Sequence, residues 1–336
     1  MLLFFKTLLI TLLSLLGVFR IGMTDAPVDA ENGGDPVIVE SDGSFYYTYT
    51  TGGGVDICKI ADYNDVAVLE RKTVYRSGAD GITGAIWAPE LHKIGDNWYI
   101  LSCAVFDANT APRGTMPQAD ANTDMAHDDF YRYGFVLKSK TEDVFGEYEF
   151  MGMLAPDGLN NIDGTYLQKD GKLYYVCSAY MNVGNQHLYI TEMSDPCTLA
   201  TDENGKHNAV CISSPQFSWE KQGWSVNEGP AVLYHGEDVF IVYSASGFSS
   251  GGYCMGMLTL NGDDVLSADN WLKSPVPVFR NRPMQDVYNA GHCSFLYLSD
   301  GSVQIVYHAT SDKEFGNAPR LTHVKPVQFI CGVPVF

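Results

Sequence analysis

The chain has 336 residues, a formal net charge of −19 at pH 7 and a pI of about 4.6. It contains no cluster of Lys or Arg, so we expect no nucleic acid partner, because proteins that bind nucleic acids present basic surfaces. An acidic surface suits a soluble protein that acts on uncharged ligands. Aromatic residues make up 12% of the chain, which fits β-structure and also permits stacking against sugar rings.

Residues 1–22 are predicted to form a signal peptide. Lys6 precedes a nearly unbroken apolar run from Leu8 to Phe19, which is short for a membrane span and typical of a secretory signal. A buried N-terminal helix is the alternative, and the cleavage site could fall anywhere before Asp35. No other stretch is apolar and long enough to span a bilayer. We therefore expect a secreted, extracellular protein with no membrane attachment after signal removal, and a single domain over residues 33–336.

A short pattern recurs five times along the chain. A polar residue opens an apolar strand, a turn that usually contains Gly follows, and a second apolar strand comes next. Recurrence at intervals of roughly 55 to 75 residues indicates a repeat architecture. Several short strands per repeat predict an all-β, five-bladed β-propeller. The residues that open the five copies are Asp35, Glu90, Asp163, Glu228 and His292.

The predicted topology gathers these five opening residues on one face, around the propeller axis. The loops that follow the second strand of each repeat return to the same face. One of them, Phe106–Tyr133, is unusually long, and we expect it to form a wall of a substrate site. Carboxylates that converge among Trp and Tyr indicate glycoside hydrolysis, which uses one carboxylic acid and one carboxylate. A metal-binding hub is the competing interpretation, because carboxylates also bind Ca²⁺.

Several short motifs, in this order, carry a resemblance to a known family. They are Asp35-Pro36, Trp87-Ala88-Pro89-Glu90-Leu91-His92, Ile162-Asp163-Gly164-Thr165, Val226-Asn227-Glu228-Gly229-Pro230-Ala231-Val232, Tyr243-Ser244-Ala245-Ser246-Gly247, Ala290-Gly291-His292 and Tyr307-His308-Ala309. With these motifs, residues 33–336 resemble glycoside hydrolase family 43, particularly its secreted arabinofuranosidase-like members. The chain departs from the family at Cys293, where Asn is expected, and in the long loop.

The resemblance implies an inverting mechanism and a role for each matching residue. Asp35 takes the position of the general base and Glu228 that of the general acid. Asp163 takes the third acidic position, which orients the acid and raises its pKa, as a nearby negative charge would. The resemblance also places Trp87, Ala88, Glu90 and Arg320 at the substrate, and it matches His292 to an axial histidine near a Ca²⁺ ion or a central water.

The activity implied by the resemblance is that of an exo-acting α-L-arabinofuranosidase on arabinan or on arabinose-decorated xylan. A β-xylosidase or an endo-arabinanase on the same fold is the alternative, and a non-catalytic glycan-binding propeller is an alternative of another class. Retention of all three acids favours an enzyme. We expect a plant cell-wall polysaccharide or oligosaccharide as substrate, a monomer, no required cofactor and a possible structural Ca²⁺.

Structural alternatives exist for several of these residues. Asp35 could be a turn residue before Pro36, and Trp87 could serve core packing alone. His308 ends a strand on the active face, where it lines the substrate site or packs in the core, while His292 could be a hydrogen-bonded core histidine. The eight Cys are compatible with a secreted protein, and most of them fall in strand-like runs and are predicted to be buried. Cys197 and Cys211 flank a polar excursion and could form a local disulfide.

Overall fold

The computed structural model describes residues 12, 26–29, 33–111, 131–182, 185–311 and 318–336. Apart from Leu12, the predicted signal peptide lies outside these described residues, and so do residues 112–130 of the long loop. In the described part of the chain, no helix is both long enough and apolar enough to cross a membrane. Regular structure there is almost entirely β-strand, interrupted by short 3-10 turns.

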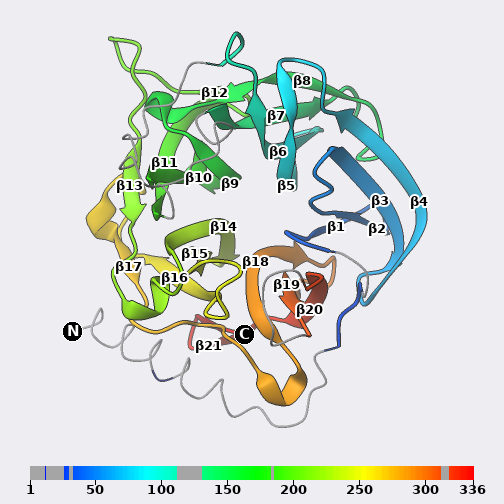
Figure 1. Cartoon of the computed structure of the whole chain (residues 1–336), viewed down its shortest axis with the longest axis vertical. Helices are drawn as coiled ribbons and strands as arrows, with labels where there is room; N and C mark the ends of the chain where they lie inside the picture. The colour runs from blue at the N-terminus through cyan, green and yellow to red at the C-terminus, as the bar shows by residue number, and fades with distance from the viewer. Residues whose placement is uncertain (1–11, 13–25, 30–32, 112–130, 183–184, 312–317) are drawn as a thin grey trace.

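The strands form five blades around a central axis, which confirms the predicted five-bladed, all-β propeller (Figure 1). The first blade contains β1 (Val37–Ser41), β2 (Ser44–Thr48), β3 (Gly54–Asp62) and β4 (Asp65–Arg76). The second contains β5 (Ile82–Ile94), β6 (Asn97–Phe106), β7 (Arg132–Ser139) and β8 (Tyr148–Leu154). In both blades each strand pairs antiparallel with the next, and the first strand lies nearest the axis (Figure 1).

The third blade contains β9 (Asn161–Lys169), β10 (Lys172–Asn182), β11 (Asn185–Asp195), β12 (Thr198–Leu199) and β13 (Val210–Ser213). The fourth contains β14 (Ser225–His235), β15 (Asp238–Ala245), β16 (Cys254–Leu260) and β17 (Trp271–Lys273). A short parallel pairing of β11 with β14 joins these two blades into one sheet. The 3-10 turns are η3 (Pro156–Gly158), η4 (Ser218–Glu220), η5 (Ala268–Asn270) and η6 (Pro283–Gln285).

The fifth blade contains β18 (Tyr288–Tyr297), β19 (Val303–Thr310) and β20 (Leu321–Pro326), and a hairpin of β21 (Gln328–Ile330) and β22 (Val333–Val335) follows it. Residues from the other end of the chain extend this blade. The backbone N–H of Val28 donates to the carbonyl of Thr322 at 2.7 Å, and that of Gly33 donates to the carbonyl of Arg320 at 2.6 Å. Both chain ends therefore close the ring, and the closure brings Asp35 beside Arg320.

The hairpins joining the first two strands of a blade follow the predicted turn chemistry. Asp42 and Gly43 both have positive φ, as do Asp170 and Gly171, which is the type I′ geometry that matches strand twist. The apolar residues of the strands pack between neighbouring blades, as in the cluster that joins the first two. The cysteines predicted to be core residues are buried, namely Cys58, Cys103, Cys177, Cys254 and Cys293.

The predicted Cys197–Cys211 disulfide is wrong, because both thiols are free. Cys211 pairs with Tyr189 on β11, whereas Cys197 lies beyond the far end of that strand, after Asp195. Six residues of extended strand separate these two levels, which is roughly 20 Å. Two Cα atoms more than about 7 Å apart cannot be bridged without backbone movement.

Candidate active site

One residue with left-handed backbone lies at the same level of the inner strand in every blade. These residues are Asp35 (φ 59°), Ala88 (φ 46°), Asp163 (φ 55°), Gly229 (φ 53°) and His292 (φ 43°). In the last four blades this position coincides with a shift in strand register. Such bulges re-aim side chains, and left-handed backbone costs a non-glycine residue about 1 kcal/mol or more. The strained residues form a ring around the axis.

This ring corrects the alignment of the repeats. The sequence pattern treated Glu90 and Glu228 as equivalent to Asp35, but the equivalent left-handed residues are Ala88 and Gly229. Glu228 therefore lies one position before the bulge and Glu90 two positions after it. The signal was present in the sequence, because Pro36, Pro89 and Pro230 each follow the left-handed residue directly. Because the acids rather than the prolines were aligned, the repeat alignment was displaced by one or two residues in the second and fourth blades.

Asp35 is buried at the axis and is surrounded by donors from three elements. Its carboxylate accepts hydrogen bonds from Arg320 Nη1 at 2.8 Å and from Thr50 Oγ1 at 2.7 Å, and its Oδ1 lies 3.2 Å from His292 Nδ1. Arg320 reaches it across Gly34, where any Cβ would collide with the guanidinium. The structure thus brings together Asp35, His292 and Arg320 from the two ends of the chain.

The surroundings of Asp35 keep it ionised. Burial raises the pKa of the Asp35 carboxyl, but Arg320, His292 and the Thr50 hydroxyl outweigh that effect and hold the pKa well below its usual range. His308 Nδ1 accepts the backbone N–H of Asp35 at 3.1 Å, so this ring carries its proton on Nε2 and is neutral. Burial, together with Arg320, lowers the pKa of His308 well below its ordinary value, which agrees with the neutral form.

Glu228 lies on β14, across the axis from Asp35. Its Oε1 accepts a hydrogen bond from the Tyr253 hydroxyl at 2.9 Å. Tyr253 directly precedes β16 and stacks on His308, with ring centroids 5.9 Å apart and planes 11° apart. Gly291 leaves the space that the Tyr253 ring occupies. His308 and Tyr253 thus connect Asp35 with Glu228 through one side chain each from the fifth and fourth blades.

Asp163 adjoins the general-acid candidate through the backbone. Its Oδ2 accepts the N–H of Gly229, the residue after Glu228, at 3.0 Å. Burial, followed by the negative charge of Asp163, raises the pKa of Glu228 to about 8. Burial also raises the pKa of Asp163 to about 6, although His292 opposes the shift. Two of the three acids therefore hold protons more tightly than usual, while Asp35 does not.

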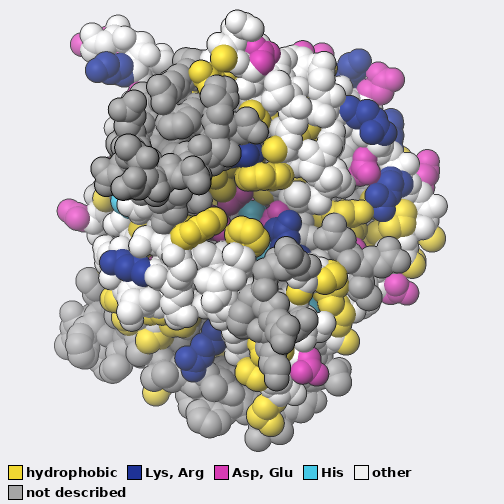
Figure 2. Space-filling view, viewed as in Figure 1, with side chains coloured by type: hydrophobic (Ala, Val, Ile, Leu, Met, Phe, Trp, Pro, Cys, Tyr) yellow, Lys and Arg dark blue, Asp and Glu magenta, His cyan; other side chains and the backbone are white. Residues whose placement is uncertain are grey.

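His292 is the histidine that the three acids share as a neighbour. Burial lowers the pKa of its imidazole, but Asp35, Asp163 and Glu228 outweigh burial and raise it overall. Its backbone N–H donates to Ser244 Oγ at 2.6 Å, which fixes the strained residue against the fourth blade. We call Asp35, Asp163, Glu228, His292 and Arg320 the axial cluster. Figure 2 shows acidic, histidine and basic side chains meeting in a hollow near the centre of one face, bordered by hydrophobic side chains.

The predicted substrate residues of the second blade have defined partners. Trp87 is partly exposed, and the guanidinium of Arg132 lies over its ring, 3.6 Å from the centroid. The N–H of Ala88 donates to Thr50 Oγ1 at 2.7 Å, so one hydroxyl links Ala88 to Asp35. Glu90 is buried, and its carboxylate is engaged by His92 Nε2 at 2.8 Å. Their contact with substrate stays a prediction.

Sequence reasoning missed three members of the site. Tyr253 follows a Gly-Gly pair at the end of a loop assigned to this face, and Thr50 opens another such loop. Arg132 closes the long loop and stacks on Trp87. Only the loop assignment pointed toward these residues, since hydroxyls and single arginines are too common to stand out in a sequence.

The predicted Ca²⁺ position at His292 has no supporting set of ligands. In the described ranges, no three or more His, Cys, Asp or Glu side chains are arranged to hold a metal ion. The His292 imidazole faces Asp35, and Ca²⁺ prefers six to eight oxygen ligands. The residues present do not fit a calcium site, and the predicted ion takes no part in the chemistry derived below.

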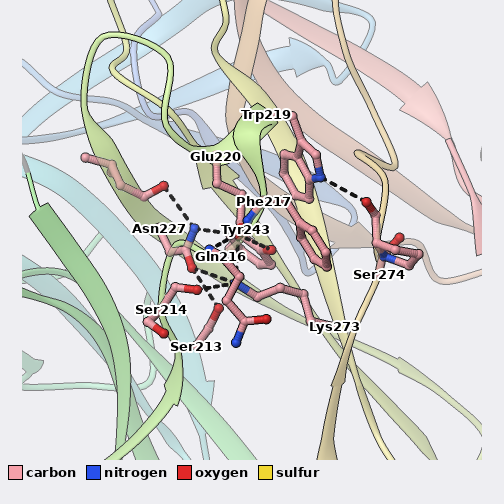
Figure 3. A network of polar contacts seen from close by, with 12 residues as sticks. Ser213, Ser214, Gln216, Phe217, Trp219, Glu220, Asn227, Tyr243, Lys273 and Ser274 are labelled. Atoms are coloured by element: carbon pink, nitrogen blue, oxygen red, sulfur yellow. Dashed lines mark hydrogen bonds and ion pairs between the residues drawn. The ribbon is translucent and has the colours of Figure 1, made fainter.

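A second buried polar group supports the strand that carries Glu228 (Figure 3). Lys273 Nζ lies 2.7 Å from Glu220 Oε1 and 3.0 Å from Asn227 Oδ1. The same Glu220 oxygen accepts from Asn227 Nδ2 and from the Tyr243 hydroxyl, each at 2.9 Å. We call Glu220, Asn227, Tyr243, Lys273 and Ser213 the blade-junction network, because it joins β13 to the fourth blade.

The fold and the axial cluster together define a propeller with three carboxyl groups of unequal pKa at its axis. The model of the family described as glycosyl hydrolases family 43 matches residues 24–334. The chain therefore belongs to glycoside hydrolase family 43.

Relatives and solved structures agree with this assignment. The chain is 32% identical over 301 residues to an extracellular exo-α-(1→5)-L-arabinofuranosidase of Streptomyces avermitilis, covering 86% of this chain and 57% of that protein. It is 31% identical to a protein of the same name from Streptomyces chartreusis, covering 83% of this chain and 80% of that one. The crystal structure of an α-L-arabinofuranosidase from Lactobacillus brevis superposes with a TM-score of 0.76 at 28% identity, covering 93% and 96% of the two chains. The chain thus spans little more than half the length of the first of these relatives.

Proposed function

We propose that this chain is a secreted glycoside hydrolase that removes terminal α-L-arabinofuranosyl residues from arabinan or from the arabinose side chains of xylan. The names of the relatives from Streptomyces and Lactobacillus support the sugar and the exo mode of action. The two Streptomyces relatives are named extracellular, which supports secretion. We further propose that it acts as a monomer on plant cell-wall polysaccharide or oligosaccharide.

The observation that carries the proposal is the opposite protonation of two carboxyl groups at the axis. Asp35 is held ionised by Arg320 and His292, while burial and Asp163 keep Glu228 protonated near neutral pH. Hydrolysis of a glycoside needs this combination, a carboxylate that accepts a proton and a carboxylic acid that donates one.

In the proposed reaction, Asp35 accepts a proton from a water molecule while the oxygen of that water attacks the anomeric carbon. Glu228 donates its proton to the glycosidic oxygen while the bond between that oxygen and the anomeric carbon breaks. Asp35 ends protonated and Glu228 ionised, and exchange with solvent restores both. Asp163 raises the pKa of Glu228 and fixes its position through the bond to the N–H of Gly229.

The connection between the two acids supports inversion. A base that activates water needs its partner acid about 6.5–9.5 Å away, whereas a nucleophile needs about 5–5.5 Å. Asp35 reaches Glu228 through a chain of His308 and Tyr253 side chains, and the fifth blade lies between their two blades. Such an arrangement leaves room for a water between the carboxylate and the sugar.

The proposal is tested by incubating the purified protein with linear and branched arabinan, with arabinoxylan and with nitrophenyl α-L-arabinofuranoside and β-xyloside. We expect release of free arabinose from the first four substrates and little xylose from the last. Release of xylose alone, or of arabino-oligosaccharides without arabinose, would contradict the proposed specificity. Absence of hydrolysis together with measurable binding would indicate a glycan-binding protein.

A further inference from the structure

The chain exposes an aromatic pair that the proposed chemistry does not use. All five tryptophans lie in described parts of the chain, and Trp224, at 47% exposure, is the only one that is not buried or partly buried. Phe248 is 46% exposed, and its ring meets that of Trp224 edge to face, with centroids 6.3 Å apart. Together they form an apolar surface in contact with water, which we call the aromatic platform.

The platform is held in place by strand pairing. Asn227 pairs with Ala245 and Glu228 with Ser244, so the segment before β14, which carries Trp224, lies beside the segment after β15, which carries Phe248. Backbone bonds extend the ladder in this direction, from the N–H of Ser246 to the carbonyl of Val226 at 3.2 Å and from that of Gly247 to the carbonyl of Gln222 at 2.9 Å. A platform with a fixed backbone loses little entropy when a ligand binds.

The platform lies beside the axial cluster. Trp224 precedes Glu228 by four residues, so their Cα atoms are at most about 14 Å apart along an extended strand. Asn289 Nδ2 donates to the carbonyl of Phe248 at 3.0 Å, and Asn289 precedes His292 by three residues on the innermost strand of the fifth blade. The platform therefore occupies the junction of the fourth and fifth blades on the face that carries the catalytic candidates.

We infer that the aromatic platform binds the leaving-group side of the substrate, as a stacking surface for the α-(1→5)-linked arabinofuranosyl residues beyond the bond that is cut. This inference rests on the proposed function. Glu228 donates its proton to the oxygen that departs with the rest of the glycan, so the departing chain must pass Glu228. The aromatic faces nearest to Glu228 along its own strand are then the first apolar surface that this chain meets.

The chemistry of the platform suits a neutral sugar chain. Aromatic rings offer large apolar area with few rotatable bonds, and the carbon-bound hydrogens of a sugar ring present a matching apolar face. Isolated exposed apolar residues are ordinary, but paired aromatic rings beside a catalytic hollow are typical of ligand sites. Trp87, with the Arg132 guanidinium over its ring, lies on the second blade and is a separate surface, which is left for the terminal arabinose.

The test compares two substrates that differ only in their reach. Methyl α-L-arabinofuranoside fills the position of the terminal sugar, whereas α-1,5-arabinotriose also extends past Glu228. We expect Trp224→Ala to lower the ratio of kcat/KM on arabinotriose to kcat/KM on the methyl glycoside by about tenfold, a usual cost of removing an aromatic anchor. Phe248→Ala should lower the ratio by a smaller factor, and Trp224→Phe should restore most of it.

Leu69→Ala is the matched control, because Leu69 is 65% exposed on the outer strand β4 of the first blade, and the ratio should not change there. An unchanged ratio in both Trp224→Ala and Phe248→Ala, with melting temperatures like wild type, would overturn the inference. A change of oligomeric state in Trp224→Ala without a change of ratio would also overturn it and make the platform a protein contact. If wild type hydrolysed neither substrate, the proposed function itself would fail.

Discussion

Two buried clusters of ionisable side chains, the blade-junction network and the axial cluster, lie on either side of β14. They shift the pKa of a glutamate in opposite directions. In the blade-junction network, Glu220 accepts five hydrogen bonds, three on Oε1 and two on Oε2. Burial raises the pKa of Glu220, but Lys273 and the backbone N–H donors of Phe217 and Gln216 outweigh it, and the pKa is lowered. In the axial cluster, Glu228 accepts from Tyr253, and its pKa is raised.

The difference matches a structural role for Glu220 and the chemical role proposed for Glu228, although both are the same kind of side chain. Glu220 is fully buried and satisfied by the protein, so its charge stabilises the folded chain and has nothing left to offer a ligand. Glu228 is partly exposed and holds its proton, because burial and Asp163 disfavour its charge and few donors compensate. Carboxyl groups that are undersatisfied at a concave face are the ones to test for catalysis.

The largest effect is expected from Asp35→Asn, which removes the only axial carboxylate whose pKa is lowered. We expect kcat on arabinan and on nitrophenyl arabinofuranoside to fall by about 10³-fold or more, because both substrates need an activated water. Asp170→Asn is a matched control, since Asp170 is also left-handed but lies in a hairpin turn on the opposite face. Wild-type turnover in Asp35→Asn would show that the axial cluster is not the catalytic site.

Glu228→Gln should lower kcat much more on arabinan than on nitrophenyl arabinofuranoside. On arabinan, whose leaving group needs a proton, we expect kcat to fall by about 10²-fold to 10⁴-fold. On nitrophenyl arabinofuranoside the loss should be much smaller, because nitrophenolate departs without protonation. Steady-state kinetics on both substrates measures the contrast, and equal losses on the two would contradict the role of Glu228 as the acid.

Lys273→Met tests the structural half of the comparison. It leaves Glu220 buried without its cation, and we expect the free energy of unfolding to fall by about 3–5 kcal/mol. The double variant Lys273→Met/Glu220→Gln should recover part of the loss, because no charge is then left unpaired. Urea denaturation measures the stabilities. A single variant as stable as wild type would show that the ion pair is dispensable.

Asp163→Asn sharpens the account of the pKa values. The amide can still accept the N–H of Gly229, but it lacks the negative charge that raises the pKa of Glu228. The basic limb of the pH–kcat profile on arabinan should move to lower pH by about one unit. A basic limb that stays in place would mean that Asp163 does not tune Glu228.

The smallest predicted effect concerns stability against pH. Glu228 has a raised pKa in the folded protein, so the native state binds the proton more tightly and wild type loses stability as pH rises from about 5 to 8. Glu228→Gln removes that loss, so the variant should be more stable than wild type at pH 8, and the difference should shrink as the pH falls toward 5. Glu220 has a lowered pKa, so its contribution is lost instead as the pH falls toward acid. Thermal melting at several pH values compares them.

The sequence predicted the fold and the main acids because both leave periodic signals. Five strand pairs joined by Gly-containing turns predicted the propeller, and Asp35, Asp163 and Glu228 were found at the start of repeats. The ring closure that sets Arg320 on Asp35 is consistent with that topology, and the resemblance had placed Arg320 at the substrate.

The remainder of the site depends on three-dimensional geometry. In two blades the sequence alignment was wrong, because it matched the acids Glu90 and Glu228 to Asp35. The structurally equivalent positions are the left-handed residues Ala88 and Gly229. Tyr253 reaches Glu228 only because Gly291, on another blade, leaves space for its ring. The Glu220–Lys273 pair joins residues more than fifty positions apart, and no local pattern marks either of them.

The stereochemistry of the first product tests the central claim most directly. Proton NMR during hydrolysis of an α-L-arabinofuranoside distinguishes the anomers of the arabinose before they equilibrate. If Asp35 activates water across the axis from Glu228, the first sugar formed is β-arabinofuranose, with inverted configuration. If the first sugar formed is the α anomer, a covalent intermediate is indicated and Asp35 is not a general base.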